Sequence, residues 1–208
     1  MGGKQLARLT NSNLAKWLRN RMGIRNYLIE GVSGTGKTTV AKELQRRGYH
    51  VIHGDRELKY RGDPKTGGPL EEPLHKSERD RAVWQQEHLL WDVDKVKSVI
   101  TDHSTPISFF CGGSRNFDRF IGLLDGIFVL EVDDLDTLYR RLDERVARDS
   151  TDWGGKPEEK ELLARLHRTK DDVPKGGVVI DATASIERVV DEILEKCNQV
   201  TDGPPDSN

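Results

Sequence analysis

Hydrophobic positions along the chain alternate between short continuous runs and runs with helical spacing. Continuous apolar runs are typical of strands that are buried on both faces, and apolar residues three or four positions apart are typical of helices that cover a sheet. Strands that alternate with helices predict a three-layer α/β sandwich around a five-stranded parallel sheet. We expect the strands at 27–29, 49–53, 106–111, 126–132 and 177–180.

The helical runs begin next to residues that cap helices well. Ser77 with Asp80 resembles a capping box, Asp133 or Asp134 precedes another apolar run, and Ser185 precedes the last one. We expect helices at 37–47, continuously from 77 to 99, at 117–123, at 135–146, at 158–168, and from Ser185 onward.

These elements form one expected domain, which spans 24–200. An N-terminal helix within 1–23, capped by Asn11 or Ser12, is expected to precede it, and the polar tail 201–208 is expected to be disordered. Clusters of glycine and proline interrupt the domain twice. They predict a flap at about 61–78 and a short lid at about 149–157.

The composition is that of a globular chain with a heavily charged surface. Of the 208 residues, 33 are Lys or Arg and 35 are Asp or Glu, which gives a formal net charge of −2. This balance argues against a nucleic-acid partner, which would require a basic surface. No run approaches the roughly 18 apolar residues of a membrane span, and the two cysteines form no disulfide framework. We therefore expect a cytoplasmic protein with no membrane partner.

The motif GVSGTGKT at 31–38 stands between the first expected strand and the helix that follows. It fits the phosphate-binding pattern G-x-x-x-x-G-K-[ST], in which glycines let backbone N–H groups form an anion nest at a helix N-terminus. Lys37 would reach the β- and γ-phosphates and the Thr38 hydroxyl would bind Mg²⁺. We assign ATP binding to Gly31, Ser33, Gly34, Thr35, Gly36, Lys37, Thr38 and Thr39.

Two polar clusters follow other strands at the same expected edge of the sheet, where ligands of parallel sheets gather. Asp55, after the second strand, would accept the proton of an attacking hydroxyl, or alternatively cap a helix at 56–60. After the third strand, Gly112 and Gly113 would let a substrate approach the backbone, and Arg115 would bind its phosphate or carboxylate. The alternative for Arg115 is an ordinary surface position after a turn.

A basic stretch precedes the expected lid. Arg141 and Arg145 share a helix face, and Arg145 would stabilise the transferring phosphoryl group. The alternative is a solvated face paired with neighbouring acids, and this alternative is favoured for Arg140. For magnesium, Cys111 stands where an acid at the end of the third strand is expected, which leaves Thr38 with Asp55 or Asp102 as candidates.

The arrangement resembles the small P-loop kinases of the adenylate, shikimate and gluconate kinase group. The resemblance covers about residues 24–198 and rests on the segments GVSGTGKTT, GDREL, CGGSR, LYRRLDERVAR and VIDATAS. It implies a P-loop NTPase fold with sheet order 2-3-1-4-5 and a short lid carrying Arg145. It also implies that Asp55 and Arg115 contact the substrate and that 181–185, including Ala182, lies beside the adenine. We assign Arg141 to the nucleotide as well. His53 and Cys111 depart from the acids of the shikimate and nucleotide kinases.

Together these features predict an ATP-dependent phosphotransferase with Lys37, Asp55 and Arg145 as catalytic residues. It would move the γ-phosphoryl group of ATP, with Mg²⁺, to a nucleoside, a nucleotide or another small hydroxylated metabolite. Two alternatives remain open. One is a kinase of nucleic-acid ends, and the other is a nucleotide-binding regulator with little catalysis, which the missing acid at Cys111 motivates.

Overall fold

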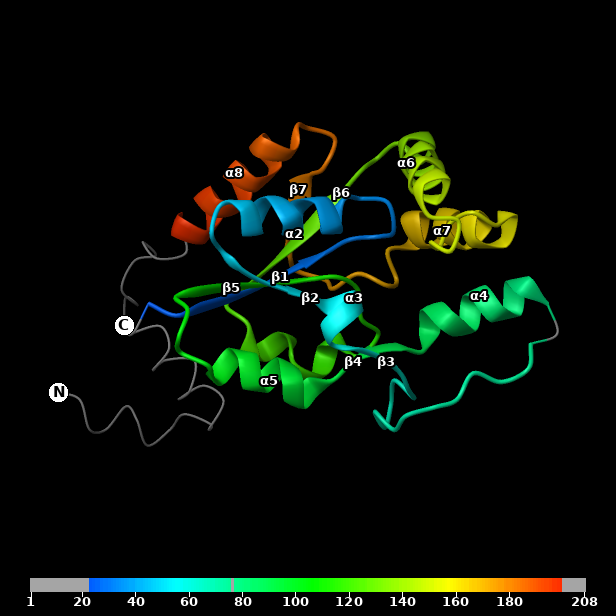
Figure 1. The fold of residues 1–208 in the computed structure, drawn as a ribbon, viewed down its shortest axis with the longest axis horizontal. Helices are drawn as coiled ribbons and strands as arrows, with labels where there is room; N and C mark the ends of the chain where they lie inside the picture. The colour runs from blue at the N-terminus through cyan, green and yellow to red at the C-terminus, as the bar shows by residue number, and fades with distance from the viewer. Residues whose placement is uncertain (1–22, 76, 200–208) are drawn as a thin grey trace.

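The computed structural model describes residues 23–75 and 77–199 and is built around a parallel sheet (Figure 1). The predicted N-terminal helix and C-terminal tail lie outside these residues. The sheet order is β2-β5-β1-β6-β7, which is the predicted order 2-3-1-4-5 when the five strands are numbered along the chain. The predicted fold class is therefore confirmed. The strands are β1 (Arg25–Glu30), β2 (His50–His53), β5 (Ile107–Cys111), β6 (Gly126–Glu131) and β7 (Val178–Asp181).

Helices cover both faces of the sheet because successive strand residues point to opposite sides. Tyr27 and Ile29 belong to one buried cluster, while Leu28 belongs to the other. In Figure 1, α2 (Lys37–Arg46) and α8 (Ile186–Gln199) lie on one face, and α5 (Val93–Thr101) lies on the other. Beyond the sheet lie α4 (Glu78–Glu87), α6 (Leu135–Arg148) and α7 (Pro157–Thr169).

The prediction of one helix from 77 to 99 is wrong. After α4, Leu89–Trp91 forms the strand β4, which pairs antiparallel with β3 (Lys59–Arg61), and α5 begins only afterwards. The Asp92 carboxylate caps α5 by accepting hydrogen bonds from the backbone N–H groups of residues 94 and 95, at 3.0 and 3.1 Å. Burial of Trp91 against the sheet and pairing with a distant strand outweigh the helical spacing.

The predicted helix at 117–123 is also wrong. The structure has two short 3₁₀ helices there, η2 (Phe117–Arg119) and η3 (Ile121–Leu123). Between them, Phe120 is buried and its ring stacks on that of Trp91 at a centroid distance of 5.5 Å. Single 3₁₀ turns let the short connection place this ring in the core.

The first part of the predicted flap is tied to the hairpin and to η2. The Tyr60 hydroxyl donates to the carbonyl of Gly67 at 2.8 Å, and Arg119 Nη2 donates to the carbonyl of Lys65 at 2.5 Å. An isolated bridge also pairs Gly62 with Pro69. Within the described residues, no helix is both long and apolar enough to cross a membrane.

Candidate functional site

The glycine loop connects β1 to α2 in the predicted way. Gly31, Gly34 and Gly36 have φ angles of 151°, 90° and 105°, which favour glycine over residues with a Cβ. A Cβ on Gly31 would lie 2.5 Å from the carbonyl oxygen of Leu130. Gly36 precedes α2 without a side-chain cap, so the first N–H groups of the helix face the loop and favour an anion.

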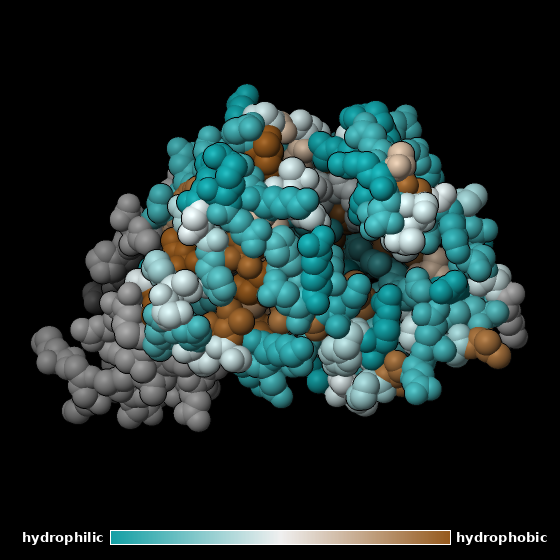
Figure 2. Space-filling view, viewed as in Figure 1, coloured by the Kyte–Doolittle hydropathy of each residue, from teal (hydrophilic) through white to brown (hydrophobic). Residues whose placement is uncertain are grey.

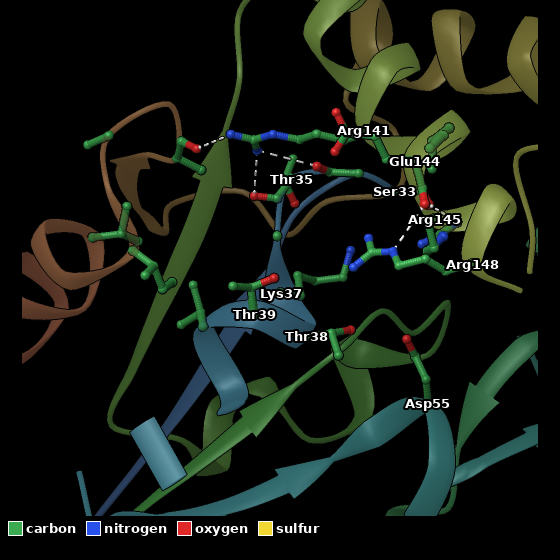
Figure 3. Close-up of a pocket in the computed structure, with 18 residues that line it drawn as sticks. Ser33, Thr35, Lys37, Thr38, Thr39, Asp55, Arg141, Glu144, Arg145 and Arg148 are labelled. Carbon is green, nitrogen blue, oxygen red and sulfur yellow. Dashed lines mark hydrogen bonds between the residues drawn. The ribbon is translucent and has the colours of Figure 1, made fainter. Parts of the chain in front are cut away.

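The loop borders a cavity of about 420 Å³ that brings most of the predicted residues together (Figure 3). Four predicted residues do not line it, namely Gly31, Gly112, Gly113 and Arg115. Arg148 and Glu144 line it and were not predicted as site residues. The predicted residues that line it are Ser33, Gly34, Thr35, Gly36, Lys37, Thr38, Thr39, Asp55, Arg141, Arg145 and Ala182.

Lys37 is held over the loop by backbone carbonyl groups. Its ammonium donates to the carbonyl of Gly31 and, at 3.2 Å, to that of Val32. Both partners are neutral, and no described carboxylate lies within ion-pair distance of the Lys37 ammonium. The charge is therefore available to a polyphosphate placed in the cavity.

Asp55 lies in α3 (Gly54–Glu57), directly after β2. His53 is the N-cap residue of this helix, so the alternative that Asp55 caps it is wrong. Asp55 Oδ1 accepts a hydrogen bond from the backbone N–H of Gly113 at 3.4 Å. Figure 3 shows Asp55 on the same side of the cavity as Thr38. The glycine turn after β5 thus lies next to the acid that borders the cavity.

Arg141 and Arg145 enter the cavity from α6. Arg141 Nη2 donates to the carbonyl of Ala182 at 2.9 Å, and its Nη1 donates to that of Thr35 at 3.3 Å. This places a planar guanidinium between the glycine loop and the loop after β7 (Figure 3). Arg145 Nη2 donates to Ser33 Oγ at 3.4 Å and to the carbonyl of Trp153. Arg145 therefore links the phosphate loop to the predicted lid.

Arg115 contacts Asp172, a residue that the sequence did not identify as part of the site. Its Nη1 donates to the backbone carbonyl of Asp172 at 2.5 Å and lies 3.8 Å from the Asp172 carboxylate. Asp172 is 6% exposed and follows α7, far along the chain from Arg115. No local spacing connects the two residues, and only the fold brings them together.

Glu30 is a second residue at the site that the sequence did not predict. It ends β1 immediately before the glycine loop and is 1% exposed. Burial raises the pKa of its carboxyl group to about 8, although nearby Lys37 and Arg115 oppose the shift. The sequence did contain a signal for Glu30, because an acidic residue there interrupts an apolar strand just before the phosphate loop.

Thr38 and Asp55 are the two magnesium candidates that border the cavity. Mg²⁺ commonly takes one or two protein oxygen ligands together with phosphates and water, and both side chains border the cavity. Asp102 is excluded because it ends α5, before β5, at the opposite edge of the sheet. Cys111 is buried, and burial raises the pKa of its thiol. Within the described residues, no group of three or more His, Cys, Asp or Glu could hold a metal ion.

Solved structures are similar to this chain at low sequence identity. A shikimate kinase from Bacteroides thetaiotaomicron is 17% identical with a TM-score of 0.51, over 84% of this chain and 98% of that one. A gluconokinase from Sinorhizobium meliloti 1021 is 18% identical, with a TM-score of 0.49 and coverage of 85% and 93%. A deoxyadenosine kinase from M. mycoides with bound dATP is 15% identical, with a TM-score of 0.47 and coverage of 83% and 99%.

The shikimate kinase confirms the resemblance to small P-loop kinases at the level of fold. No curated protein matches the chain in sequence. A family model described as an AAA domain, AAA_18, matches residues 28–164, which include the glycine loop, Asp55 and Arg145. The chain therefore belongs to the AAA_18 family of AAA domains and has the fold of the small P-loop kinases.

Proposed function

We propose that the protein is an ATP-dependent kinase of a small hydroxylated molecule, which is a nucleoside, a nucleotide or another metabolite. One observation carries the proposal, namely that a single cavity joins the phosphate loop, the acid Asp55 and the arginine Arg145. A phosphate-binding loop alone would serve many activities, but an acid and an arginine facing it favour phosphoryl transfer.

Each residue of the site has a role that follows from its charge. The loop N–H groups and Lys37 hold the β- and γ-phosphates, and Arg141 and Ala182 border the base. Asp55 accepts the proton of the attacking hydroxyl. Arg145 stabilises the charge that builds up on the transferring group. Thr38 would bind Mg²⁺ directly and Asp55 would contact it through a bound water, and the ion would neutralise phosphate charge.

The test is to replace Lys37 with alanine. Because the ammonium donates hydrogen bonds only to neutral carbonyl groups, its loss should leave the fold intact and lower ATP-dependent phosphorylation by roughly 100-fold or more. The measurement is ADP release with a panel of acceptors, together with the rise in melting temperature on adding ATP. Lys42→Ala, at an exposed position of the same helix, is the matched control and should change neither quantity. Undiminished turnover in Lys37→Ala would refute the assignment.

The position of Cys111 favours a second candidate, a nucleotide-binding regulator with little catalysis. The strand-end acid of nucleotide kinases is replaced here by a buried thiol. If ATP raises the melting temperature while no small acceptor and no oligonucleotide end is phosphorylated, this second function replaces the first. Phosphorylation of oligonucleotide ends alone would instead support the nucleic-acid-end kinase.

A further inference from the structure

The cations around the nucleotide cavity are mostly not paired with acids. Lys37, Arg141 and Arg148 all line it, and none has a carboxylate within ion-pair distance among the described residues. Arg145 lies 3.8 Å from Asp152. Uncompensated cations in a cavity favour a polyanion. This side of the site is therefore suited to the phosphates of a nucleotide.

A second cavity, of about 530 Å³, has the opposite character. It lies between α4 and the predicted lid, in a part of the molecule whose surface is mainly hydrophilic in Figure 2. Both cations that line it are already paired with acids: Arg81 Nε lies 2.9 Å from Glu72 Oε1, and Lys156 pairs with Glu78. Further carboxylates of Asp152 and Glu159 line it as well.

Arg145 separates the two cavities. Its guanidinium donates to Ser33, which lines the first cavity, and to the carbonyl of Trp153, which lines the second. A molecule in the second cavity would thus lie across Arg145 from the phosphate loop. Neither Asp55 nor Arg115 lines this second cavity.

Arg115, the predicted anchor for an acceptor anion, is compensated inside the protein. Asp172 holds it through its backbone carbonyl and carboxylate, and Gln86 Nε2 donates to Asp172 Oδ2 at 3.0 Å. The Arg115 side chain is 12% exposed and Asp172 is 6% exposed, so water screens this pair weakly. An acceptor phosphate or carboxylate would have to compete with an acid that is already in place.

The glycine turn beside Arg115 offers partners for hydroxyl groups. A Cβ on Gly112 would lie 2.9 Å from Asp55 Oδ1. A Cβ on Gly113 would lie 3.1 Å from Glu30 Oε1 and 3.3 Å from Arg115 Nη2. A hydroxyl group can donate to a carboxyl oxygen and accept from a guanidinium at the same time, whereas an anion can only accept.

The buried atoms around this turn also lack partners. Glu30 Oε2, Arg115 Nε and Asp172 Oδ1 are inaccessible to solvent and make no hydrogen bond. Buried polar atoms are rarely left unsatisfied in folded proteins, so these atoms favour a further hydrogen-bonding partner. The Asp172 oxygen is an acceptor and the Arg115 N–H is a donor, which again fits a group that both donates and accepts.

We propose that the phosphoryl acceptor is an uncharged molecule with several hydroxyl groups, a nucleoside or neutral sugar, and that Asp172 disfavours anionic acceptors by compensating Arg115. This inference rests on the proposed kinase activity. The acceptor hydroxyl oxygen bonds to the γ-phosphorus of ATP, the bond from that phosphorus to the β–γ bridging oxygen breaks, ADP leaves, and the hydroxyl proton passes to Asp55.

The experiment compares matched neutral and anionic acceptors. Nucleosides and neutral sugars are assayed beside the corresponding 5′-monophosphates and sugar acids, with ADP release and product mass as readouts. The wild type should prefer the neutral member by at least roughly 100-fold in kcat/KM, because like charges placed together are strongly unfavourable. This comparison uses the wild type alone, so the misfolding of a variant cannot affect it.

The variant Asp172→Asn tests whether Asp172 causes the preference for neutral acceptors. The variant keeps the side-chain shape but leaves Arg115 uncompensated, so the preference for neutral acceptors should fall by roughly tenfold, chiefly through a lower KM for the anionic ones. A purely structural role would instead lower kcat/KM for both classes alike. Asp171→Asn removes the same charge at an exposed neighbouring position and should leave the preference unchanged.

The outcomes separate this inference from the kinase proposal. Wild-type preference for monophosphates or sugar acids, or an unchanged preference in an active Asp172→Asn variant, overturns the inference while the kinase activity stands. Failure to phosphorylate any acceptor, despite stabilisation by ATP, overturns both.

Discussion

Glu30 shows how a single buried residue sets a pH dependence. Its carboxyl group lies beneath the glycine loop, where its Oε1 accepts a hydrogen bond from the backbone N–H of Gly31 at 3.3 Å. Burial disfavours the charged form and raises the pKa from its usual 4.5 to about 8. Between these two values the unfolded chain is ionised while the folded protein holds the proton. Folding therefore becomes less favourable as the pH rises through this window.

Glu30→Gln should remove this dependence. At pH 4 the variant and the wild type should differ little in free energy of unfolding, and at pH 8 the variant should be more stable, by an upper limit of roughly 4 kcal/mol. Denaturant unfolding at the two pH values measures the change. Glu87→Gln, at an exposed position of α4, is the control and should shift stability equally at both. A difference between Glu30→Gln and wild type that does not vary with pH would contradict the expectation.

Among the elements, the hairpin of β3 and β4 positions the candidate acid. Trp91 in β4 is fully buried and packs so closely on α3 that a Cβ on Gly54 would lie 2.0 Å from its ring. Asp55 follows Gly54 directly, so the place of the carboxylate depends on this contact. The hairpin that the sequence did not predict therefore takes part in building the site.

Gly54→Ala should disturb this packing. The added methyl group forces the indole of Trp91 out of its place, which should lower the free energy of unfolding by about 1–3 kcal/mol. It should also reduce phosphoryl transfer because Asp55 moves with α3. Gly122→Ala serves as the control, since a Cβ there meets nothing within 4 Å. If the two variants have equal melting temperatures, the close packing of Trp91 on α3 is not required.

At the scale of the whole molecule, α4 and the lid side of the domain approach each other across the second cavity (Figure 1). Lys156 pairs with Glu78, and Arg79 Nη2 lies 3.0 Å from Glu161 Oε1. The side chains of these four residues are about half to two-thirds exposed. Exposed pairs contribute little to stability, so these two ion pairs add little to the contact between the two sides, which also includes the buried Ala82 of α4.

A double-mutant cycle of Glu78→Gln and Lys156→Met measures this contact. The coupling free energy should be below about 1 kcal/mol and should fall when the salt concentration is raised from about 0.05 to about 0.5 M. Thermal or denaturant unfolding of the four proteins gives the value. The cycle of Lys97 with Asp94, an exposed pair within α5, provides a reference. A coupling of several kcal/mol that is insensitive to salt would mean that the two sides are locked together.

The sequence by itself determined the strands of the sheet and the glycine loop, because both depend on residues close together in the chain. An apolar run such as 27–29 is buried wherever the strand lies, and the glycines before Lys37 have the φ angles that their motif requires. The resemblance carried by the motifs also gave the strand order.

Only the tertiary structure decided which partners these residues meet. Leu89–Trp91 is a strand because it pairs with Lys59–Arg61, and its local pattern favoured a helix. Arg115 is compensated because Asp172 lies beside it, 57 residues away along the chain. Hydrogen bonds and charge pairs of this kind depend on distance in space and on burial. Neither the distance nor the burial can be derived from the spacing of residues along the sequence.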